Sequence, residues 1–435
     1  MIFSDTKESY NAEARRILDL LKRDFRLPDG ALCLEKVGDQ TSPHHIFPDL
    51  GDFLPFFLYF GEESFIDEQI SLFKKTLMDG VLISEFPSFG FSSLAKSYEY
   101  SDLLFGLFDY NSFKNNSEST ELLLKSAKTA IKIFRFDGRI KSFWFSKLKI
   151  GLPIMDTRDG TFVEFYVDMY KVTGDERYIQ VAHNIYDNLI SSSFYKQNRL
   201  FATFDGPIWV RFLFLILKIR KHMEANICKN NTNSLFGMFS LYSLTKDKKI
   251  LQTIEQTVDS IKEKAIVGGG VSGVYSKVNS TSVASLTASF AMIDFLCDLY
   301  NEVGQNKYLE LAEGIANYWI ELQGTTGLFP FSGSVKDSFF DSETDMTVAL
   351  LKLYELTSKV EYKEAADKCF NGIMQYHSTR DFVLAVNIDT GEVINTAQRT
   401  KFLALFLKLL ILKIEILDGK KIYEDKRLWS LLKDR

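Results

Sequence analysis

Thr173-Gly174-Asp175-Glu176-Arg177-Tyr178, with Ala182 four residues beyond the tyrosine, is the stretch of this chain that decides its fold. The same spacing returns in Val303-Gly304-Gln305-Asn306-Lys307-Tyr308 before Ala312 and in Thr357-Ser358-Lys359-Val360-Glu361-Tyr362 before Ala366. Weaker copies start at Thr245, with Ile250 in the place of the tyrosine, and at Gly61, with Phe65 there. Each copy joins an apolar helix to an amphipathic one, and a spacing of roughly fifty to seventy residues is typical of stacked helical units. We therefore expect an array of helical hairpins along nearly the whole chain.

Two kinds of helix alternate between these turns. Helices that are apolar nearly all round are expected at residues 53–60, 103–110, 162–172, 208–219, 235–244, 286–300, 346–356 and 402–417. Helices with one charged face are expected at residues 64–77, 119–134, 177–189, 249–264, 307–322 and 362–374. A helix that is apolar all round is buried on every side, whereas a charged stripe marks a solvent face. The alternation predicts an all-α fold, an (α/α) toroid of inner and outer helices. It has seven hairpins if residues 208–219 are an extra element, and six if some N-terminal helices are accessory.

The two ends of the chain are expected to meet. The last apolar helix, residues 402–417, has no outer helix after it, and the helix predicted at residues 8–25 supplies one by packing alongside. We expect a single toroid domain over residues 1–435, with residues 1–50 forming an N-terminal helix and loop on the ring. The glycine-rich segment 268–275 alternates small and apolar residues, which predicts a short β-hairpin on one rim.

Composition excludes several classes of protein. The net charge of -5 gives no electrostatic footprint for nucleic acid. The four cysteines are far apart and match no metal-binding spacing, so we expect no metal, no cofactor and a reducing compartment. The N-terminus lacks the blocks of a signal peptide, and lysines interrupt the longest apolar stretches, so we expect a cytoplasmic chain without a membrane span.

The Thr-Gly-Asp-x-x-Tyr turn at Thr173, together with the inner and outer alternation, resembles the six-hairpin glycosidase-like superfamily of (α/α) toroids. Its members include glycoside hydrolases, unsaturated glucuronyl hydrolases, sugar 2-epimerases and polysaccharide lyases. The resemblance covers most of the chain from Gly51 to Leu417, but the motif set of no single member family is present. It implies a cavity at the rim where inner helices begin, lined by aromatic and acidic residues that bind sugar.

The loop before the expected helix 162–172 is the first candidate site. Asp156 and Asp159 flank Arg158 there, and Glu164 follows inside the helix. Two nearby carboxylates can separate their pKa values and act as acid and base in glycosyl transfer or proton abstraction, with Arg158 and Glu164 binding substrate. The alternative is helix capping, because Asp159 makes a good N-cap and an acid in the first turn suits the helix dipole.

The second candidate site lies before the helix expected to begin near Met346. It combines the aromatic residues Phe339 and Phe340 with the acids Asp341, Glu343 and Asp345. An aromatic ring stacks on the apolar face of a pyranose while carboxylates hold its hydroxyl groups, so Asp341 and Asp345 are candidate catalytic acids and the others candidate substrate contacts. Ser342 to Asp345 also resembles a capping box, which is the structural alternative.

The third candidate site contains two of the five histidines, His44 and His45, close to Asp52. A histidine is the natural base near neutral pH, although adjacent histidines in a loop are more often solvated or structural. Further substrate contacts are expected from side chains at the start of two other inner helices: Trp209, Arg211 and Arg399. An arginine at the cavity mouth could hold a uronate carboxylate bidentately.

Three functions follow from this pattern. The first is a carbohydrate-active enzyme that acts on an oligosaccharide or a uronic-acid-containing glycan by hydrolysis, elimination or epimerisation. The second is a non-catalytic toroid that binds a glycan or a protein partner, and the third is an isoprenoid-processing toroid, encouraged by the 38 phenylalanines. Serine-hydrolase, phosphate-loop and dinucleotide-binding motifs are absent from the sequence.

Overall fold

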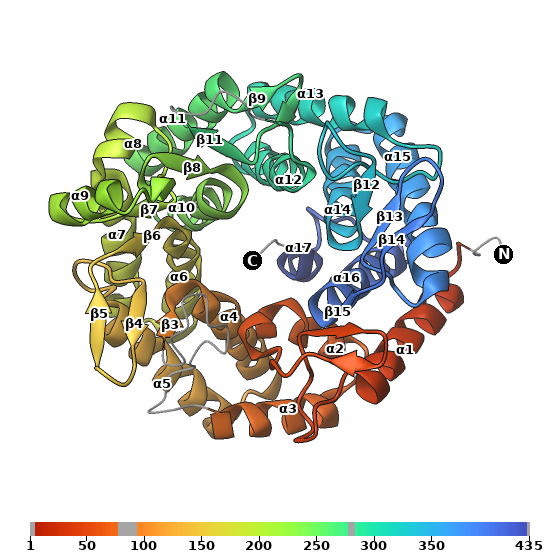
Figure 1. Cartoon of the computed structure of the whole chain (residues 1–435), viewed down its shortest axis with the longest axis horizontal. Helices are drawn as coiled ribbons and strands as arrows, with labels where there is room; N and C mark the ends of the chain where they lie inside the picture. Colours follow the sequence, from red (N-terminus) through yellow and green to blue (C-terminus); the bar gives the residue numbers. More distant parts are fainter. Residues whose placement is uncertain (1–4, 77–93, 277–282, 433–435) are drawn as a thin grey trace. The chain divides into compact units, whose positions relative to one another are not determined.

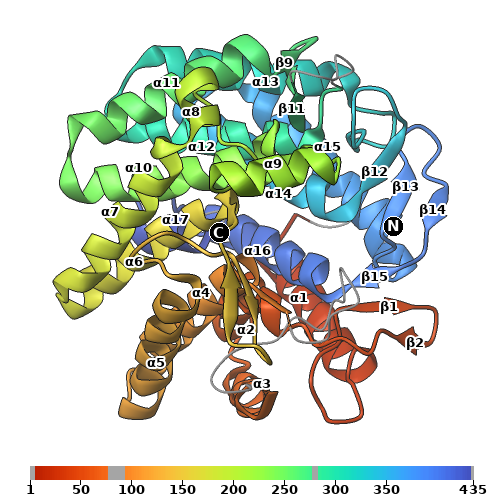
Figure 2. The same ribbon diagram turned by 60° about the vertical axis from the view of Figure 1, so that its left-hand side comes forward.

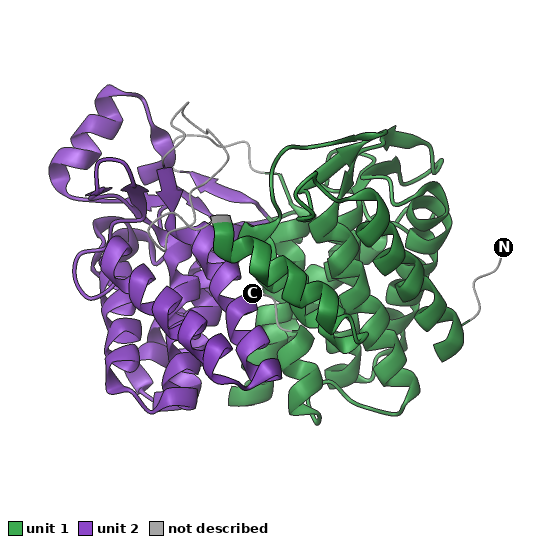
Figure 3. Ribbon diagram, turned by 90° about the horizontal axis from the view of Figure 1, so that it is seen from below, with its two compact units in different colours: residues 1–75, 267–271, 283–434 green, residues 76–266, 272–282, 435 purple. Residues whose placement is uncertain are grey.

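The computed structural model describes residues 5–76, 94–276 and 283–432. The chain divides into two compact units, drawn in different colours in Figure 3. Unit 1 contains residues 1–75, 267–271 and 283–434, and unit 2 contains residues 76–266, 272–282 and 435. The candidate acids Asp341 and Asp345 belong to unit 1, and Asp156 and Asp159 belong to unit 2.

The described residues of unit 2 form three helical hairpins, whose helices are labelled in Figure 2. They pair α4 (Ser97–Lys114) with α5 (Ser117–Phe134), α6 (Thr161–Thr173) with α7 (Glu176–Ser191), and α10 (Asn233–Thr245) with α11 (Lys248–Lys264). The first members, α4, α6 and α10, also pack against one another, α6 contacting both others, and bury most of their side chains. They are the inner helices that the apolar pattern predicts.

Short strands connect the hairpins of unit 2. β3 (Leu94–Lys96), β4 (Phe143–Phe145) and β5 (Ile150–Leu152) form an antiparallel sheet, and β6 (Met155–Asp156) pairs with β7 (Phe204–Asp205). β8 (Glu224–Asn226) pairs with β11 (Val274–Ser276), so the glycine-rich segment forms strand as expected. The short helical elements are η2 (Thr157–Gly160), α8 (Ser193–Asn198), α9 (Ile208–Ile216), η3 (Arg220–His222) and η4 (Ile227–Thr232). β9 (Ile266–Val267) and β10 (Gly270–Val271) lie where the chain passes into unit 1.

Unit 1 holds four helix pairs, whose members are labelled in Figure 1. They are α2 (Leu54–Tyr59) with α3 (Glu63–Thr76), α12 (Leu286–Val303) with α13 (Asn306–Leu322), α14 (Phe340–Thr357) with α15 (Val360–Gly372), and α16 (Thr400–Leu417) with α1 (Lys7–Asp24). Residue 77, the last of the helix expected at 64–77, lies outside the described residues. The described residues of the two units thus contain seven helix pairs, and the seventh uses α1 rather than residues 208–219.

The packing of α1 along α16 confirms that the two ends of the chain meet. Both helices belong to unit 1, and Lys7 forms an ion pair of 2.6 Å with Asp418 just beyond α16. A last helix, α17 (Lys426–Leu432), packs against α16. Its Trp429 donates through Nε1 to Asp298 on α12. The N-terminal helix thus completes the hairpin that the sequence order leaves open.

Strands also connect the helices of unit 1. β1 (Glu35–Val37) lies between β2 (Gln40–Thr41) and β15 (Gln398–Arg399), which leads directly into α16. β13 (Ala385–Asn387) lies between β12 (Asp337–Phe339) and β14 (Val393–Asn395), and β12 leads directly into α14. The irregular helices η1 (Phe47–Asp52), η5 (Ile373–His377) and η6 (Ser378–Arg380) complete the unit. The two sheets therefore position the N-terminal ends of α14 and α16.

The recurring turn has a common hydrogen-bond pattern. The hydroxyl groups of Thr173, Thr245 and Thr357 each donate to the carbonyl four residues earlier and accept the amide two residues later. The residue after each threonine has a positive φ, 67° at Gly174, 54° at Lys246 and 57° at Ser358, which ends the inner helix in the left-handed region. The threonine side chain therefore joins the end of one helix to the start of the next.

The expectation that residues 208–219 form a helix buried on every side is wrong. Only Val210 and Phe214 of α9 are buried, whereas Ile208 is 85% exposed and Phe212 is 62% exposed. An apolar sequence buries only the faces that neighbouring elements cover, and α9 turns a single i, i+4 face inward. Among the helices that the structure describes, none is long and apolar enough to cross a membrane.

Candidate functional site

The acids of unit 2 are carried by a tight connection between β6 and α6. Asp156 ends β6 and caps η2 by accepting the amide of Arg158 at 3.1 Å. Gly160 ends η2, and a Cβ on it would lie 2.5 Å from the Cα of Ser234, so this turn packs directly on α10. The close contact at Gly160 therefore fixes the position of the turn that carries Asp156 and Asp159 against α10.

Asp156 is fully buried and its carboxylate is occupied by protein partners. Arg158 donates through Nη2 at 2.6 Å and Asn230 donates through Nδ2 at 2.9 Å. The Arg158 guanidinium also lies 3.5 Å from the ring centroid of Tyr98. The charge of Asp156 is thus held between an arginine and an amide, which is the stronger kind of charge-assisted contact.

Asp159 is equally buried, but among the described residues no cationic side chain is bonded to it. The hydroxyl of Ser142 donates to its Oδ2 and accepts the amide of Asp156, so a single serine joins the two acids. Burial and the charge of Asp156 raise the pKa of Asp159 to about 8, against the hydroxyls of Ser142 and Ser97 and the charge of Arg158. Asp159 is therefore protonated at neutral pH, the state of a general acid.

The capping alternative for Asp159 is wrong. The residue that caps α6 is Gly160, which makes no side-chain cap bond, while Asp159 points to Ser142. The acid that does cap a helix is Asp156, which is the N-cap of the preceding short helix η2. Glu164 lies in the first turn of α6 and is 1% exposed, so it is part of the interior of unit 2.

The acids of unit 1 lie within the first turns of α14. This helix begins at Phe340 rather than near Met346, and its N-cap residue Phe339 makes no side-chain cap bond, so the expected capping box is wrong. Asp341 and Asp345 are one helical turn apart and therefore lie on one face, with Cβ atoms about 5–6 Å apart. Both side chains reach solvent in part.

Lysines from α16 surround these acids. Lys408 Nζ lies 3.5 Å from Asp345 Oδ1, and Lys401 Nζ lies 2.5 Å from Asp52 Oδ2. The pKa of Asp345 is raised to about 6, because burial and the charges of Asp341 and Asp52 raise it more than the charge of Lys408 lowers it. Burial likewise raises the pKa of Asp341, opposed by Lys401 and Arg399. Three carboxyl groups and two ammonium groups thus share one electrostatic environment.

Two other residues of this segment belong to the interior. Glu343 is fully buried and accepts from the amide of Phe329 at 2.8 Å, the hydroxyl of Ser338 at 2.7 Å and the thiol of Cys369 at 2.8 Å. Burial raises the pKa of Glu343 to about 8. Phe340 is 1% exposed and packs against His377 and Phe406. Both residues were expected to contact substrate, and instead they hold the start of α14 in the core of unit 1.

Most of the remaining candidates have other partners in the structure, and the charge of Arg399 also acts on Asp341. His45 contacts Asp29 at 2.9 Å, and its neighbour His44 is partly exposed in the same loop. Arg211 pairs with Asp205 at 2.6 Å, and Trp209 is 60% exposed on α9. Arg399 donates to Glu35 at 2.7 Å across the sheet of β1 and β15, while Phe339 lies against Phe331 with ring centroids 4.8 Å apart.

Several residues of these clusters were not predicted from the sequence. Lys401, Lys408, Ser142, Asn230 and Tyr98 all contact or electrostatically influence a candidate acid or its partner. A signal existed for Lys408, because a lysine inside a helix that is apolar all round requires a buried partner. Serine, asparagine and tyrosine carry no such signal, since they occur throughout the chain.

No protein family model matches this chain, and no curated protein is similar to it in sequence. Solved structures are similar in fold. An alpha-1,2-mannosidase from Trichoderma reesei matches at 12% identity over 94% of this chain and 92% of its own, with a TM-score of 0.64. A D-mannose isomerase matches at 11% identity over 95% of this chain and 98% of its own, with a TM-score of 0.58.

An unsaturated glucuronyl hydrolase specific for heparin matches at 13% identity over 86% of this chain and 98% of its own, with a TM-score of 0.53. The identities are low, so these likenesses concern the fold alone. They confirm the predicted fold class: the chain is an all-α protein with the (α/α) toroid fold.

Proposed function

We propose that this chain is a carbohydrate-active enzyme and that Asp341 and Asp345 supply its acid and base. The observation that carries the proposal is the placement of the partly exposed Asp345, with Lys408 3.5 Å away, one helical turn from the carboxyl group of Asp341. Burial raises the pKa of both groups, that of Asp345 to about 6. Two interacting carboxyl groups with raised pKa values can divide a proton between them near neutral pH. One then donates a proton while the other accepts one, as hydrolysis, elimination and epimerisation of a sugar all require.

Access favours the acids of unit 1 over those of unit 2. Asp345 keeps 13% of its side chain exposed, whereas Asp156 and Asp159 are 0% exposed and bonded to Arg158, Asn230 and Ser142. A catalytic acid must come within hydrogen-bond reach of its substrate. Asp159 nevertheless has the protonation state of a general acid, so the pair Asp156 and Asp159 remains the second candidate for the reacting groups.

The positive groups fit a substrate that carries hydroxyl or carboxylate groups. Lys401 has 30% of its side chain exposed and lies beside both Asp52 and Asp341. An ammonium group there can donate to a sugar hydroxyl or pair with a uronate. The solved structures of similar fold are named as enzymes of mannose, of mannosides and of unsaturated glucuronides, and carbohydrate is what these names share. An oligosaccharide or a uronic-acid-containing glycan is therefore the proposed substrate.

Single asparagine variants of Asp341, Asp345, Asp156 and Asp159 test the proposal against a panel of oligosaccharides, with turnover followed by chromatography. Loss of Asp345 or Asp341 is expected to lower kcat by about 100-fold or more with little change in KM, the usual scale of acid–base catalysis. Asp389→Asn is the matched control, because Asp389 is an exposed acid of the same unit, paired with Lys336 at 3.4 Å. Full turnover in both α14 variants would overturn the assignment of the pair.

A non-catalytic glycan-binding toroid is the alternative function. It is favoured by the enclosure of Asp156 and Asp159, which leaves one of the two acid pairs without access to a substrate. Binding of a glycan by wild-type protein that turns over no member of the panel would establish this alternative. Turnover of an isoprenoid diphosphate instead would favour the third function suggested by the phenylalanine content.

We also infer a reducing, cytoplasmic location. All four cysteines are free thiols, and Cys33, Cys297 and Cys369 are buried. Chains that work in oxidising compartments commonly use their cysteines in disulfides. Fractionation of cells that express the tagged chain tests this inference, and recovery of the protein outside the cytoplasmic fraction would overturn it.

A further inference from the structure

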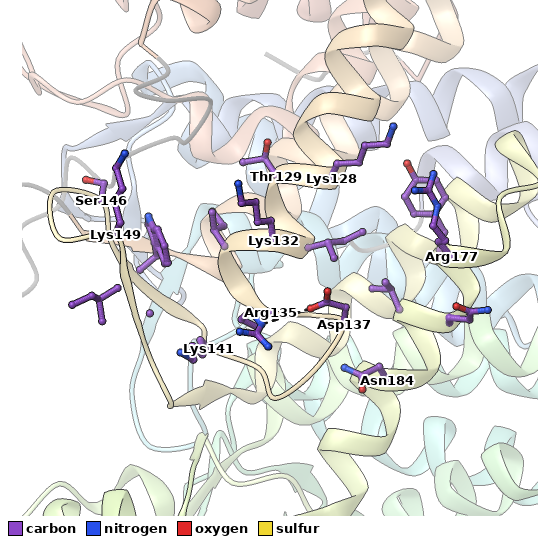
Figure 4. A pocket seen from close by; sticks show the side chains of 18 residues that line it. Lys128, Thr129, Lys132, Arg135, Asp137, Lys141, Ser146, Lys149, Arg177 and Asn184 are labelled. Atoms are coloured by element: carbon purple, nitrogen blue, oxygen red, sulfur yellow. Dashed lines mark ion pairs between the residues drawn. The ribbon is translucent and has the colours of Figure 1, made fainter.

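Unit 2 contains a cavity of about 1300 Å³ with walls of strongly positive character. Its residues come from α5, from the loop after α5, from the hairpin of β4 and β5, and from α7. Its cationic residues are Lys128, Lys132, Arg135, Lys141, Lys149 and Arg177, and its one acidic lining residue is Asp137. Figure 4 shows Lys149 on one side of the cavity and Arg177 on the other, with Lys132 and Arg135 between them. The chain as a whole has a net charge of -5, so this concentration of positive charge is local.

Most of these cations are not neutralised by the protein. Within the described part of the chain, Lys128, Lys132, Lys141 and Lys149 form no ion pair with an acid. Arg177 is paired with Asp175, and Arg135 lies 3.8 Å from Asp137. Like charges around one cavity repel one another, and an anion placed between them would remove that repulsion.

Part of the positive surface is held by a fixed frame. Asn184 on α7 donates to the carbonyl of Phe136 at 2.6 Å and to that of Gly138 at 2.8 Å, which pins the loop carrying Arg135 and Lys141. The side chain of Lys141 packs directly over Gly151 on β5, because a Cβ on Gly151 would lie only 2.9 Å from the Cδ of Lys141. These contacts fix the backbone of the loop and the side chain of Lys141, whereas Lys128, Lys132 and Lys149 extend from the surrounding elements as exposed side chains.

Trp144 adds an aromatic surface to the same cavity. It lies on β4, is partly exposed and is paired with Gly151 across the hairpin. An indole ring offers a flat apolar face to one side of a pyranose, and neighbouring hydroxyl and amide groups can bind its hydroxyls. Thr129, Ser146 and Gln180 supply such polar groups in the lining. Lysines alone would suit any anion, whereas the ring favours an anion attached to a sugar.

We propose that this cavity binds a segment of an anionic glycan, with lysines on its sulfate or carboxylate groups and Trp144 on a sugar face. The choice of a glycan among anionic ligands rests on the proposed function. None of the candidate catalytic acids lines the cavity, so it is a binding site additional to the reacting groups. It would hold a long substrate chain to the protein independently of the chemistry.

Isothermal titration calorimetry on the full chain tests this site without requiring turnover. The probes are a heparin hexasaccharide, hexagalacturonate, the neutral maltohexaose, inorganic phosphate and a single-stranded DNA dodecamer. The test protein carries Lys128→Ala, Lys132→Ala and Lys149→Ala. The matched control carries Lys248→Ala, Lys249→Ala and Lys262→Ala, which remove the same charge from exposed positions on α11 in the same unit.

At least one anionic hexasaccharide is expected to bind wild type and the control alike, and to bind the test protein about tenfold or more weakly. The affinity should fall with added salt, because the contacts are between charges. Trp144→Phe, which retains an aromatic ring in the hairpin, is expected to weaken the binding of the hexasaccharide and to leave the binding of phosphate unchanged. Maltohexaose should not bind at this site.

Four results would overturn the proposal. They are no binding of either anionic hexasaccharide, equal weakening in test and control proteins, phosphate binding as tight as the hexasaccharides, and preferential binding of DNA through the same lysines. Repeating the titration with Asp345→Asn protein separates the two hypotheses. Retained binding with no turnover by wild type leaves the cavity assignment standing and removes the enzymatic one, whereas turnover without lysine-dependent binding does the opposite.

Discussion

Lys408 on α16 places its ammonium group 3.5 Å from the carboxylate of Asp345 on α14. Both side chains are almost enclosed, at 4% and 13% exposure. The lysine is the strongest influence that lowers the pKa of Asp345, against the burial that raises it to about 6. This contact therefore lowers the pH at which Asp345 loses its proton, against the effect of burial.

Replacing Lys408 by methionine is expected to raise the pKa of Asp345 by about one unit or more, because burial then acts without an opposing charge. The acid limb of kcat/KM against pH should move upward by the same amount, and a carboxyl carbon NMR titration should show the shift without turnover. Lys413→Met is the control, since Lys413 is on the same helix and pairs with Asp367 at 2.9 Å. An equal shift in both variants would contradict a specific role of Lys408.

Glu343 provides a prediction about stability and pH. Its pKa of about 8 in the folded state exceeds its ordinary value of 4.5, so between these pH values the folded chain holds a proton that the unfolded chain has released. The free energy of unfolding therefore falls as the pH rises from about 4.5 to 8, by at most about 1.4 kcal/mol per pH unit from this group. Glu343→Gln, which cannot ionise, should remove that part of the slope.

Urea unfolding at pH 5 and pH 8 measures the effect. Relative to wild type, Glu343→Gln should gain stability between the two pH values, and Glu392→Gln, at an exposed acid of the same unit, should not. Parallel curves for wild type and Glu343→Gln would show that the carboxyl of Glu343 is ionised in the folded chain at neutral pH.

The threonines of the repeated turn are expected to contribute to stability through their hydroxyl groups. Thr357 donates to the carbonyl of Leu353 at 2.8 Å and accepts the amide of Lys359 at 3.2 Å. Thr357→Val keeps the shape and removes both bonds, which should cost about 1 kcal/mol or more. Thr357→Ser keeps the hydroxyl and should cost less in the same unfolding measurement. A serine variant as unstable as the valine variant would assign the role to the methyl group.

The same turn explains how much of the fold was predictable from the sequence. Its threonine, its helix-ending residue and its buried tyrosine lie within a few consecutive residues. Each copy therefore predicts a helical hairpin without information from distant parts of the chain. The pairing of α1 with α16 was predictable for a similar reason, since an inner helix without an outer partner leaves an apolar face uncovered.

The candidate sites were less predictable because their environment comes from distant segments. Asp159 meets Ser142 from another loop, and Asp345 meets Lys408 from a helix more than sixty positions later. Spacing in the sequence also failed to show that Glu343 and Phe340 turn inward, because the start of α14 was placed several residues too late. Residues read as part of a loop were assigned no buried face, so the helical periodicity that turns them inward was not applied to them.

Helix α9 gives the sharpest test of where an apolar pattern misleads. Ile208 and Ile216 are 85% and 61% exposed, whereas Phe214 is 5% exposed and packs against Phe204 and His222. Ile208→Lys and Ile216→Lys should therefore change the free energy of unfolding by no more than about 0.5 kcal/mol, as expected for surface positions. Phe214→Ala should cost about 3 kcal/mol, because it removes a ring from a packed contact. Losses of that size in the lysine variants would show that the outer face of α9 is covered in solution.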